Sequence, residues 1–327
     1  WSVALYGTNL LVAQGGLDVV SLADPAAPTL IGTYTSTLQA ALDVAVSGDT
    51  AFITADGLEA ISLADPAHPV QIGVFPTEQK TSGCPSSGSG WTLKPCRAVA
   101  VSGNAAYVAD DTFGLKVVAI ADPSSMNQTR AYQGLGRVLD VAAQGDYLFV
   151  NDRDVGMRIL DVHTPSQPTL LGTLPLTGTL ETVEVAGNYA YVGNGWPGDY
   201  GLFAIDVSNP NNPSQTAHLD TIGDPNHISI HNGHLYLTTG YEWTGMQILS
   251  LTNPAQPQKV GEIVSPDIVA GGYDIALRGS YAYVADWGLM RAYNIADPSN
   301  PFPVGVYDPG TWANYIYSVA TDPTDPD

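Results

Sequence analysis

Basic residues are scarce in this chain. Only 11 Lys and Arg stand against 32 Asp and Glu, which gives a formal net charge of −21. Binding to nucleic acid, or to an anionic membrane surface, requires clusters of Lys and Arg, and the sequence contains none. The composition therefore excludes DNA and RNA as partners. The excess of acid either keeps an exposed surface soluble or attracts cations or a basic partner.

Long apolar runs and known catalytic motifs are also lacking. No stretch approaches the roughly 20 apolar residues of a membrane-spanning helix, so we expect no membrane insertion. Residues 1–5 already read as a strand instead of a signal peptide, which favours a mature or trimmed form. No helical periodicity and no GxSxG, HExxH or Walker sequence is found. No motif therefore identifies an enzyme.

Cysteine is limited to Cys84 and Cys96, which bracket a stretch rich in Ser and Gly. A disulfide that closes so short a loop contributes about 3 kcal/mol by the chain-entropy estimate. Paired cysteines of this kind are typical of secreted or periplasmic proteins. We expect a Cys84–Cys96 disulfide and an extracellular or cell-surface location, with the periplasm and a pair of free thiols as the alternatives.

The dominant feature of the sequence is a repeat. The line Gly-Leu-Asp-Val-Val-Ser-Leu-Ala-Asp-Pro at 16–25 returns with small changes at 57–66 and 114–123, and looser copies follow. Each copy ends in a proline, and most of these prolines lie 41 to 45 residues apart: Pro25, Pro66, Pro123, Pro165, Pro210, Pro254 and Pro298. One interval of 57 residues holds an insertion at 76–96. Seven repeats of about 44 residues follow from this spacing.

Each repeat contains four short strands. In the second copy these are 43–46, 51–53, 57–62 and 70–74, rich in β-branched residues and separated by Gly and Asp-Pro turns. Four strands per repeat, seven times over, predict an all-β fold, a seven-bladed β-propeller of four-stranded antiparallel blades. An open β-solenoid is the weaker alternative.

The domain limits follow from the repeat, and we place the propeller at 1–314. Residues 317–320 repeat the pattern of residues 1–4, so the tail at 315–327 is either an extra strand or an acidic, Pro-rich linker. An eight-bladed ring with an incomplete last blade is therefore an alternative, and the chain is expected to be part of a larger polypeptide or assembly.

The repeat resembles a known family. Gly-Leu-x-Val-x-Asp-x-x-x-Pro, combined with Val-Ala-Val-Ser-Gly and Ala-Tyr-Val-Ala-Asp, is similar to the LVIVD repeat of bacterial and archaeal surface proteins. The resemblance covers essentially the whole chain; residues 157–161 match its core closely, whereas residues 289–293 depart from it. It implies a β-propeller at the cell surface and names no activity and no catalytic residue.

The topology of a propeller sorts the connections onto two faces. Turns between strands one and two, and between three and four, lie on one face, and these are uniform here. The other connections lie on the opposite face, vary in length and carry five of the six Trp; this loop-rich face is our candidate functional face. Its aromatic residues are Trp91, Trp196, Tyr200, Tyr241, Trp243, Trp287 and Trp312. They are suited to stack on sugars or contact a protein, unless they fill gaps between blades.

A second candidate site lies where strand one begins, at the expected channel mouth. Asp43, Asp140, His227 and Asp274 occupy the same position in their repeats, and Arg97 lies next to it. Such carboxylates accept hydrogen bonds from backbone amides, hold calcium or another divalent cation, or act as an acid/base pair. We expect the first role and no cofactor. A calcium-like stretch at 152–156 lacks the remaining ligand spacing.

Together these features favour a non-enzymatic binding or scaffolding module that uses its loop-rich face. The expected partners are proteins or carbohydrates at the cell surface. The alternative is a secreted enzyme with a metal or acid/base site at the channel mouth.

Overall fold

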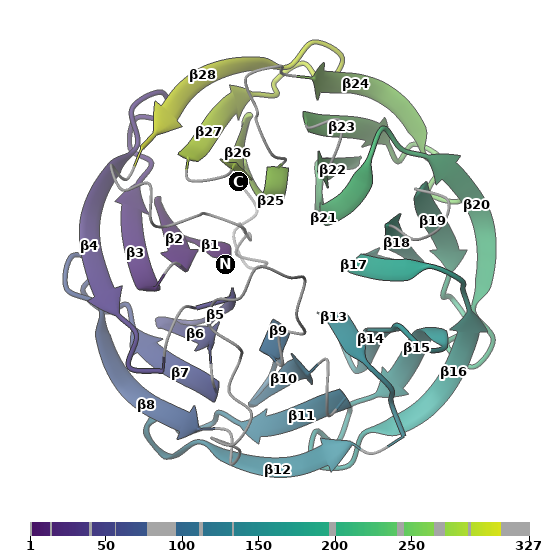
Figure 1. Ribbon diagram of the computed structural model, residues 1–327, viewed down its shortest axis with the longest axis horizontal. Helices are drawn as coiled ribbons and strands as arrows, with labels where there is room; N and C mark the ends of the chain where they lie inside the picture. The colour runs from purple at the N-terminus through teal and green to yellow at the C-terminus, as the bar shows by residue number, and fades with distance from the viewer. Residues whose placement is uncertain are drawn as a thin grey trace, which may run out of the picture.

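The computed structural model describes residues 2–13, 15–38, 41–55, 57–76, 96–110, 114–132, 134–195, 201–240, 245–264, 272–286 and 289–308. These residues form seven four-stranded sheets, each built from four consecutive strands in antiparallel order. Figure 1 shows the sheets as the blades of a ring, with the first strand of each blade nearest the axis and the fourth on the rim. The seven-bladed propeller is thereby confirmed.

The strands follow the chain in order, four to a blade. Blades one to three are β1 (Val3–Tyr6), β2 (Asn9–Ala13), β3 (Gly16–Ser21), β4 (Thr29–Thr35); β5 (Asp43–Ser47), β6 (Thr50–Thr54), β7 (Gly57–Ser62), β8 (Val70–Pro76); β9 (Cys96–Ser102), β10 (Ala105–Asp110), β11 (Gly114–Ala119), β12 (Asn127–Tyr132). Blades four and five are β13 (Val138–Gln144), β14 (Tyr147–Asp152), β15 (Gly156–Asp161), β16 (Thr169–Pro175); β17 (Thr179–Ala186), β18 (Tyr189–Gly195), β19 (Gly201–Asp206), β20 (Ser214–Asp220). Blades six and seven are β21 (Asp224–His231), β22 (His234–Gly240), β23 (Gly245–Ser250), β24 (Gln258–Val264); β25 (Gly272–Arg278), β26 (Tyr281–Asp286), β27 (Leu289–Asn294), β28 (Phe302–Tyr307).

Helix is nearly absent, as the sequence predicts. The described residues contain one short 3-10 helix, η1 (Pro123–Ser125), in the turn that follows the third strand of blade three. No helix in them has the length and apolar character of a membrane span. The tail at 315–327, which the sequence leaves open between an extra strand and a linker, lies outside the described residues.

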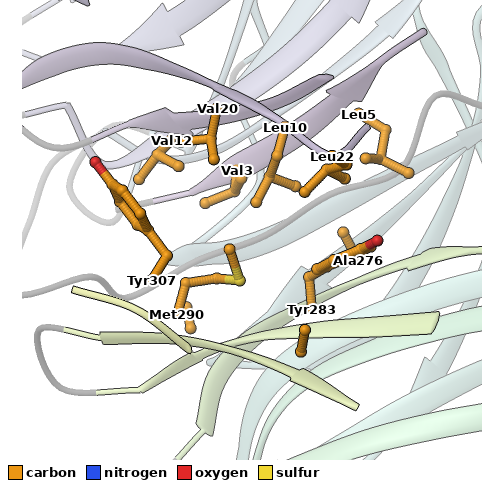
Figure 2. Packing of buried hydrophobic residues seen from close by; sticks show 12 residues of the cluster. Val3, Leu5, Leu10, Val12, Val20, Leu22, Ala276, Tyr283, Met290 and Tyr307 are labelled. Carbon is orange, nitrogen blue, oxygen red and sulfur yellow. The ribbon is translucent and has the colours of Figure 1, made fainter. Parts of the chain in front are cut away.

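The hydrophobic core is divided among the joints between blades. Seven clusters of buried residues are found, and each is made by two neighbouring blades. Figure 2 shows the cluster that closes the ring, where Val3 and Leu10 of blade one face Tyr283 and Met290 of blade seven. Every described sheet consists of four consecutive strands, so within the described residues it is packing between blades one and seven that joins the two ends of the ring.

Close backbone contacts explain why glycine and proline recur together. A Cβ added to Gly261 in the fourth strand of blade six would lie 2.0 Å from the carbonyl oxygen of Pro298 in blade seven. The same pairing occurs between Gly73 and Pro123, at 1.7 Å. Only a residue without a side chain allows the Asp-Pro turn of the next blade to approach so closely. The Gly and Pro of the repeat therefore set the spacing between blades.

Candidate functional site

On the face that carries the turns between strands one and two, side chains link one turn to the next. The Tyr6 hydroxyl donates to Asp49 Oδ1 at 2.6 Å, and Gln144 makes two hydrogen bonds to the backbone of Gly187. His231 Nε2 lies 2.9 Å from the carbonyl oxygen of Gly279. These contacts between turns hold neighbouring blades together, so we assign this face a structural role.

The predicted aromatic residues of the loop-rich face fall outside the part of the chain that the structure describes. Trp91, Trp196, Tyr200, Tyr241, Trp243, Trp287 and Trp312 are all outside the described residues, as is Cys84. Cys96 and Arg97 belong to the backbone of β9, but their side chains are outside the description too. The aromatic face and the disulfide therefore stay predictions.

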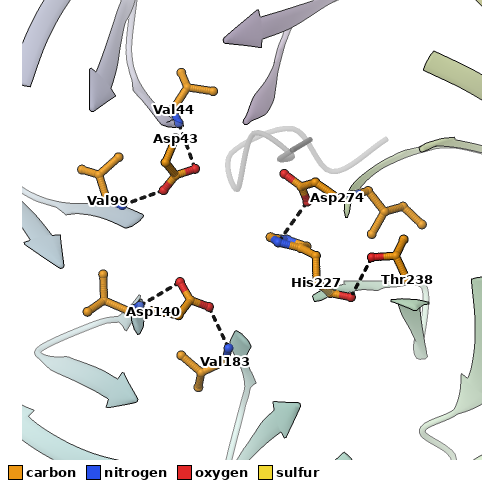
Figure 3. A network of polar contacts seen from close by, with 10 residues as sticks. Asp43, Val44, Val99, Asp140, Val183, His227, Thr238 and Asp274 are labelled. Atoms are coloured by element: carbon orange, nitrogen blue, oxygen red, sulfur yellow. Dashed lines mark hydrogen bonds and ion pairs between the residues drawn. The ribbon is translucent and has the colours of Figure 1, made fainter. Parts of the chain in front are cut away.

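The structure does bring together the residues predicted at the channel mouth. Seven equivalent positions at the start of the innermost strands form what we term the axial column: Ser2, Asp43, Ala98, Asp140, Thr182, His227 and Asp274. Figure 3 shows the three Asp and the His of this column arranged around the axis of the ring. Asp274 is buried, whereas the side chains of Asp43, Asp140 and His227 keep some surface toward the channel but are poorly solvated, because protein atoms of the ring surround them.

Two of the carboxylates tie neighbouring blades together. Asp43 accepts hydrogen bonds from the amide of Val44 in its own strand, at 2.9 Å, and from that of Val99 in blade three, at 2.6 Å. Asp140 repeats the arrangement with the amides of Val141 and Val183, both at 2.8 Å (Figure 3). The innermost strands have no further strand on their inner edge, so these amides would otherwise lack a backbone partner. Both carboxylates make the hydrogen bonds to backbone amides that the sequence led us to expect.

This arrangement explains why only some blades carry Asp. One carboxylate serves the amide of its own blade and that of the next blade, so an Asp on alternate blades is enough. The three Asp of the axial column stand on blades two, four and seven. Asp43 and Asp140 thus serve blades two to five in pairs, whereas Asp274 accepts the amide of Ile275 in its own blade and blade six carries His227. The pairing therefore accounts for the column in blades two to five.

His227 uses a neighbouring carboxylate instead. Its Nδ1 lies 3.0 Å from Oδ1 of Asp274 in blade seven, and that oxygen also accepts the amide of Ile275 at 2.6 Å. Burial alone lowers the pKa of His227, but the charge and hydrogen bond of Asp274, together with Asp140 and Glu184, raise it to about 9. The imidazole is therefore protonated at neutral pH and forms an ion pair between blades six and seven.

Glu184 completes the group, although the sequence reasoning did not identify it. It occupies the position two residues after the axial column, which in the other blades holds a small residue: Ala4, Ala45, Ala100, Ala142, Ser229 and Ala276. Burial and the charges of Asp140 and Asp274 raise its pKa to about 7, against the opposing effect of His227. The signal that could have found it is this one carboxylate in a column of small residues.

The remaining carboxylates of the group are also poorly solvated. Burial raises the pKa of Asp140 to about 7, and it also raises that of Asp43, although hydrogen bonds to backbone amides partly offset the effect. The group formed by Asp43, Asp140, Glu184, His227 and Asp274 holds four acids against one imidazolium. Its negative charge favours cations over anions, and the raised pKa values mean that Asp140 and Glu184 bind protons more readily than free carboxylates do.

A metal site in a protein needs several ligand side chains that converge on one point. Among the residues that the structure describes, no group of three or more His, Cys, Asp or Glu is placed to hold a metal ion. In the calcium-like stretch, Asp152 accepts the amides of Gly136 and Asp154 and lies 3.1 Å from Nε of Arg158. The guanidinium of Arg158 supplies the positive charge next to Asp152, so this stretch is a turn that is closed by an ion pair.

Comparison with solved structures places the fold among known propellers. A candidate 6-phosphogluconolactonase from Bacteroides uniformis is 13% identical with a TM-score of 0.73, over 91% of this chain and 98% of that one. A protein from Lactobacillus plantarum is 15% identical with a TM-score of 0.72, over 91% and 98%. The computationally designed Ika8 protein is 11% identical with a TM-score of 0.67, over 99% and 90%. Identities this low show a shared fold and nothing of activity.

Comparison with sequences gives a narrower result. None of the curated proteins compared with the chain matches it. The family model of the LVIVD repeat matches six times, at residues 1–36, 40–77, 96–133, 135–174, 177–221 and 272–309. Blade six, which carries His227 in place of the column Asp, falls between the matches. With six of its seven blades matched, the chain belongs to the LVIVD repeat family.

Proposed function

We propose that this chain is a non-enzymatic binding module of the cell surface, and that it engages its partner through the loop-rich face. The observation that carries the proposal is the unequal distribution of the connections. Between strands one and two, the described residues hold short turns of two residues in every blade. The opposite face carries connections as different as residues 14–15 and residues 77–95. A rigid ring that varies on one face only is typical of a scaffold for recognition loops.

Two further features support a binding role. The turns between strands one and two are engaged in contacts between blades, and so are the carboxylates of Asp43 and Asp140 at the channel mouth. The connections of the loop-rich face are therefore the ones left for recognition. Five of the six Trp are in or beside its connections, and Trp is suited to stack on sugar rings. We therefore favour a carbohydrate of the cell surface as the partner, with a protein as the alternative.

The proposal predicts that aromatic residues of the loop-rich face carry the affinity. Trp196→Ala and Trp243→Ala should each weaken binding to an array of surface polysaccharides at least tenfold, because each removes a stacking platform. Asp140→Ala is the matched control: it should lower the melting temperature through the loss of a tie between blades, and leave the affinity unchanged. Tryptophan variants that bind as the parent does would contradict the proposal, and binding to envelope proteins but not to glycans would replace the carbohydrate by a protein.

Export is tested separately through the cysteines. Protein isolated from its native compartment without reductant is expected to contain the Cys84–Cys96 disulfide, because such a bond persists only in an oxidising environment. Intact-mass measurement should show the loss of two hydrogens and no reaction with an alkylating reagent until the protein is reduced. Two free thiols would contradict the location, whatever the outcome of the glycan array.

A second function is favoured by one observation, the ion pair of His227 and Asp274, which resembles an acid/base pair. With a pKa of about 9, however, His227 is a proton donor at neutral pH and a poor general base. Hydrolysis of 6-phosphogluconolactone, the substrate that the name of the Bacteroides uniformis protein implies, is the assay for this alternative. Turnover that His227→Gln abolishes without loss of folding would establish the enzyme and overturn the binding module.

A further inference from the structure

Blade three carries a modification motif that no other blade has. Asn127-Gln128-Thr129 fits the acceptor sequence for N-linked glycans, which is Asn-x-Ser or Asn-x-Thr with any residue except proline in the middle. It is the only match in the chain, because Asn212-Pro213-Ser214 in blade five has suitable ends but is excluded by its proline. The motif is short, so its meaning depends on where the structure places it.

The turn before this motif differs from the corresponding turn of the other blades. Six blades have a second proline three residues after the first: Pro28, Pro69, Pro168, Pro213, Pro257 and Pro301. Blade three has Met126 there instead, and Met126 is buried in the core that blades two and three share. Asn127 follows directly as the first residue of β12, which Figure 1 shows on the rim. The acceptor therefore lies at the outer edge of its blade, next to a residue that is anchored in the core.

All three residues of the motif are exposed. A β-bulge places Thr129 between the residues that pair with Val117 and Val118, and the strict alternation of a strand does not hold across it. Asn127, Gln128 and Thr129 are each exposed to solvent. A glycan on Asn127 would therefore extend away from the blade without displacing a packed side chain.

The fold gives a reason for Thr129 but not for Asn127. The Thr129 hydroxyl donates to the carbonyl oxygen of Val117 at 3.2 Å, and Thr216 makes the equivalent bond within blade five at 3.1 Å. Asn127 Nδ2 lies 3.4 Å from the carbonyl oxygen of Ser125, at the outer limit of a hydrogen bond. The Asn127 amide is thus exposed and weakly held, so it is available as an acceptor.

We propose that Asn127 carries an N-linked glycan. The inference rests on the exported location in the proposed function, and it is independent of what the loop-rich face binds. The donor is an oligosaccharide linked to a lipid phosphate: a bond forms between Asn127 Nδ2 and the anomeric carbon, and the bond from that carbon to the phosphate oxygen breaks. The amide loses a proton, and the lipid phosphate leaves with the electron pair. The product is a bulky, soluble group on the rim of blade three.

This site lies away from the recognition loops. Asn127 follows the turn between strands three and four, which is on the same face as the turns between strands one and two. A glycan at this place covers part of the open edge of β12, and a covered edge strand is protected from pairing with another chain. The glycan leaves the loop-rich face open.

The test is mass spectrometry of protein isolated from its native host without reductant. Tryptic cleavage after Lys116 and Arg130 should release peptide 117–130 with the mass of a glycan added. Asn127→Gln should remove the added mass, and so should Thr129→Ala, because each destroys the acceptor sequence. Thr129→Ser is the matched control, since it preserves both the acceptor sequence and the hydroxyl that bonds Val117, and it should keep the glycan. None of these changes should alter binding through the loop-rich face.

The same spectra separate this inference from the exported location. A Cys84–Cys96 disulfide together with an unmodified Asn127 would overturn the glycan and leave the location standing. Two free thiols together with an unmodified Asn127 would overturn both. An added mass that survives Asn127→Gln would lie on a hydroxyl of the same peptide, and it would overturn the proposal as well.

Discussion

Raising the pH from 5 to 9 is expected to lower the melting temperature of this protein steadily, by roughly 2–4 °C for each kcal/mol of stability lost, with about 1.4 kcal/mol lost per unit of pKa shift. Most proteins reach their greatest stability between about pH 5 and 8. Here the decline should begin in mildly acidic solution, because the ionisable groups on the axis bind protons more tightly in the folded ring than in the unfolded chain.

The direction follows from the groups one by one. Burial raises the pKa of Asp140 and Glu184 to about 7, from 3.8 and 4.5, so folding takes up protons between these values and stability falls as the pH rises through them. His227 has its pKa raised from 6.5 to about 9 despite its burial, since Asp274 holds the imidazolium. Its stabilisation is complete below pH 6.5 and is lost as the pH rises to 9. The two effects have the same sign and act in successive windows.

Single substitutions separate the two windows. Glu184→Gln should raise the melting temperature at pH 8 and remove part of the slope between pH 4.5 and 7. His227→Gln should lower the melting temperature at pH 6 and remove the slope between pH 6.5 and 9. His231→Gln is the control for the second variant, because His231 lies on the opposite face and bonds a backbone carbonyl of a neighbouring turn. A profile that stays flat from pH 5 to 9 in the parent, or is unchanged by both axial variants, would refute this account.

The fold could be predicted from the sequence because the repeat contains glycine and proline at positions where the backbone conformation and the spacing between blades require them. A Gly-Leu or Gly-Met pair and a turn that contains proline mark every blade, and both have steric reasons: Gly261 admits the turn at Pro298, and Pro298 cannot continue a strand. Strand limits were less certain. In the second copy, the strand predicted at 70–74 extends to Pro76 in β8, which pairs with Gly57 at the start of β7.

The candidate site was only half predictable, and the reason is geometric. Equal position in the repeat was enough to bring Asp43, Asp140, His227 and Asp274 together, since the ring turns equivalent residues toward one axis. It could not show that one carboxylate would serve two blades, because that requires the distance between Asp140 and Val183. Glu184 was missed for a related reason: its raised pKa depends on burial and on charged residues of other blades, which the pattern of its own repeat does not show.

Adding a single methyl group at a joint between blades should have a large effect. Gly261→Ala is expected to destabilise the propeller by about 3 kcal/mol, at the upper end of what overpacking costs. The new Cβ would lie 2.0 Å from the carbonyl oxygen of Pro298, and both groups belong to backbone that cannot rotate away. Blade six and blade seven would have to separate, and the core they share around Tyr236, Ile275 and Tyr293 would loosen.

Equilibrium unfolding in urea measures this cost, and Gly103→Ala provides the control. Gly103 lies in a turn with no atom within 4 Å of an added Cβ, but its φ of +55° is unfavourable for other residues. That substitution should cost about 1–2 kcal/mol for the left-handed conformation alone. The comparison thus separates steric contact between blades from backbone conformation within one blade. If Gly261→Ala proved as mild as a surface change, the close approach of strand and Asp-Pro turn would not be what fixes the spacing of the blades, and glycine and proline would not share a steric reason for their places in the repeat.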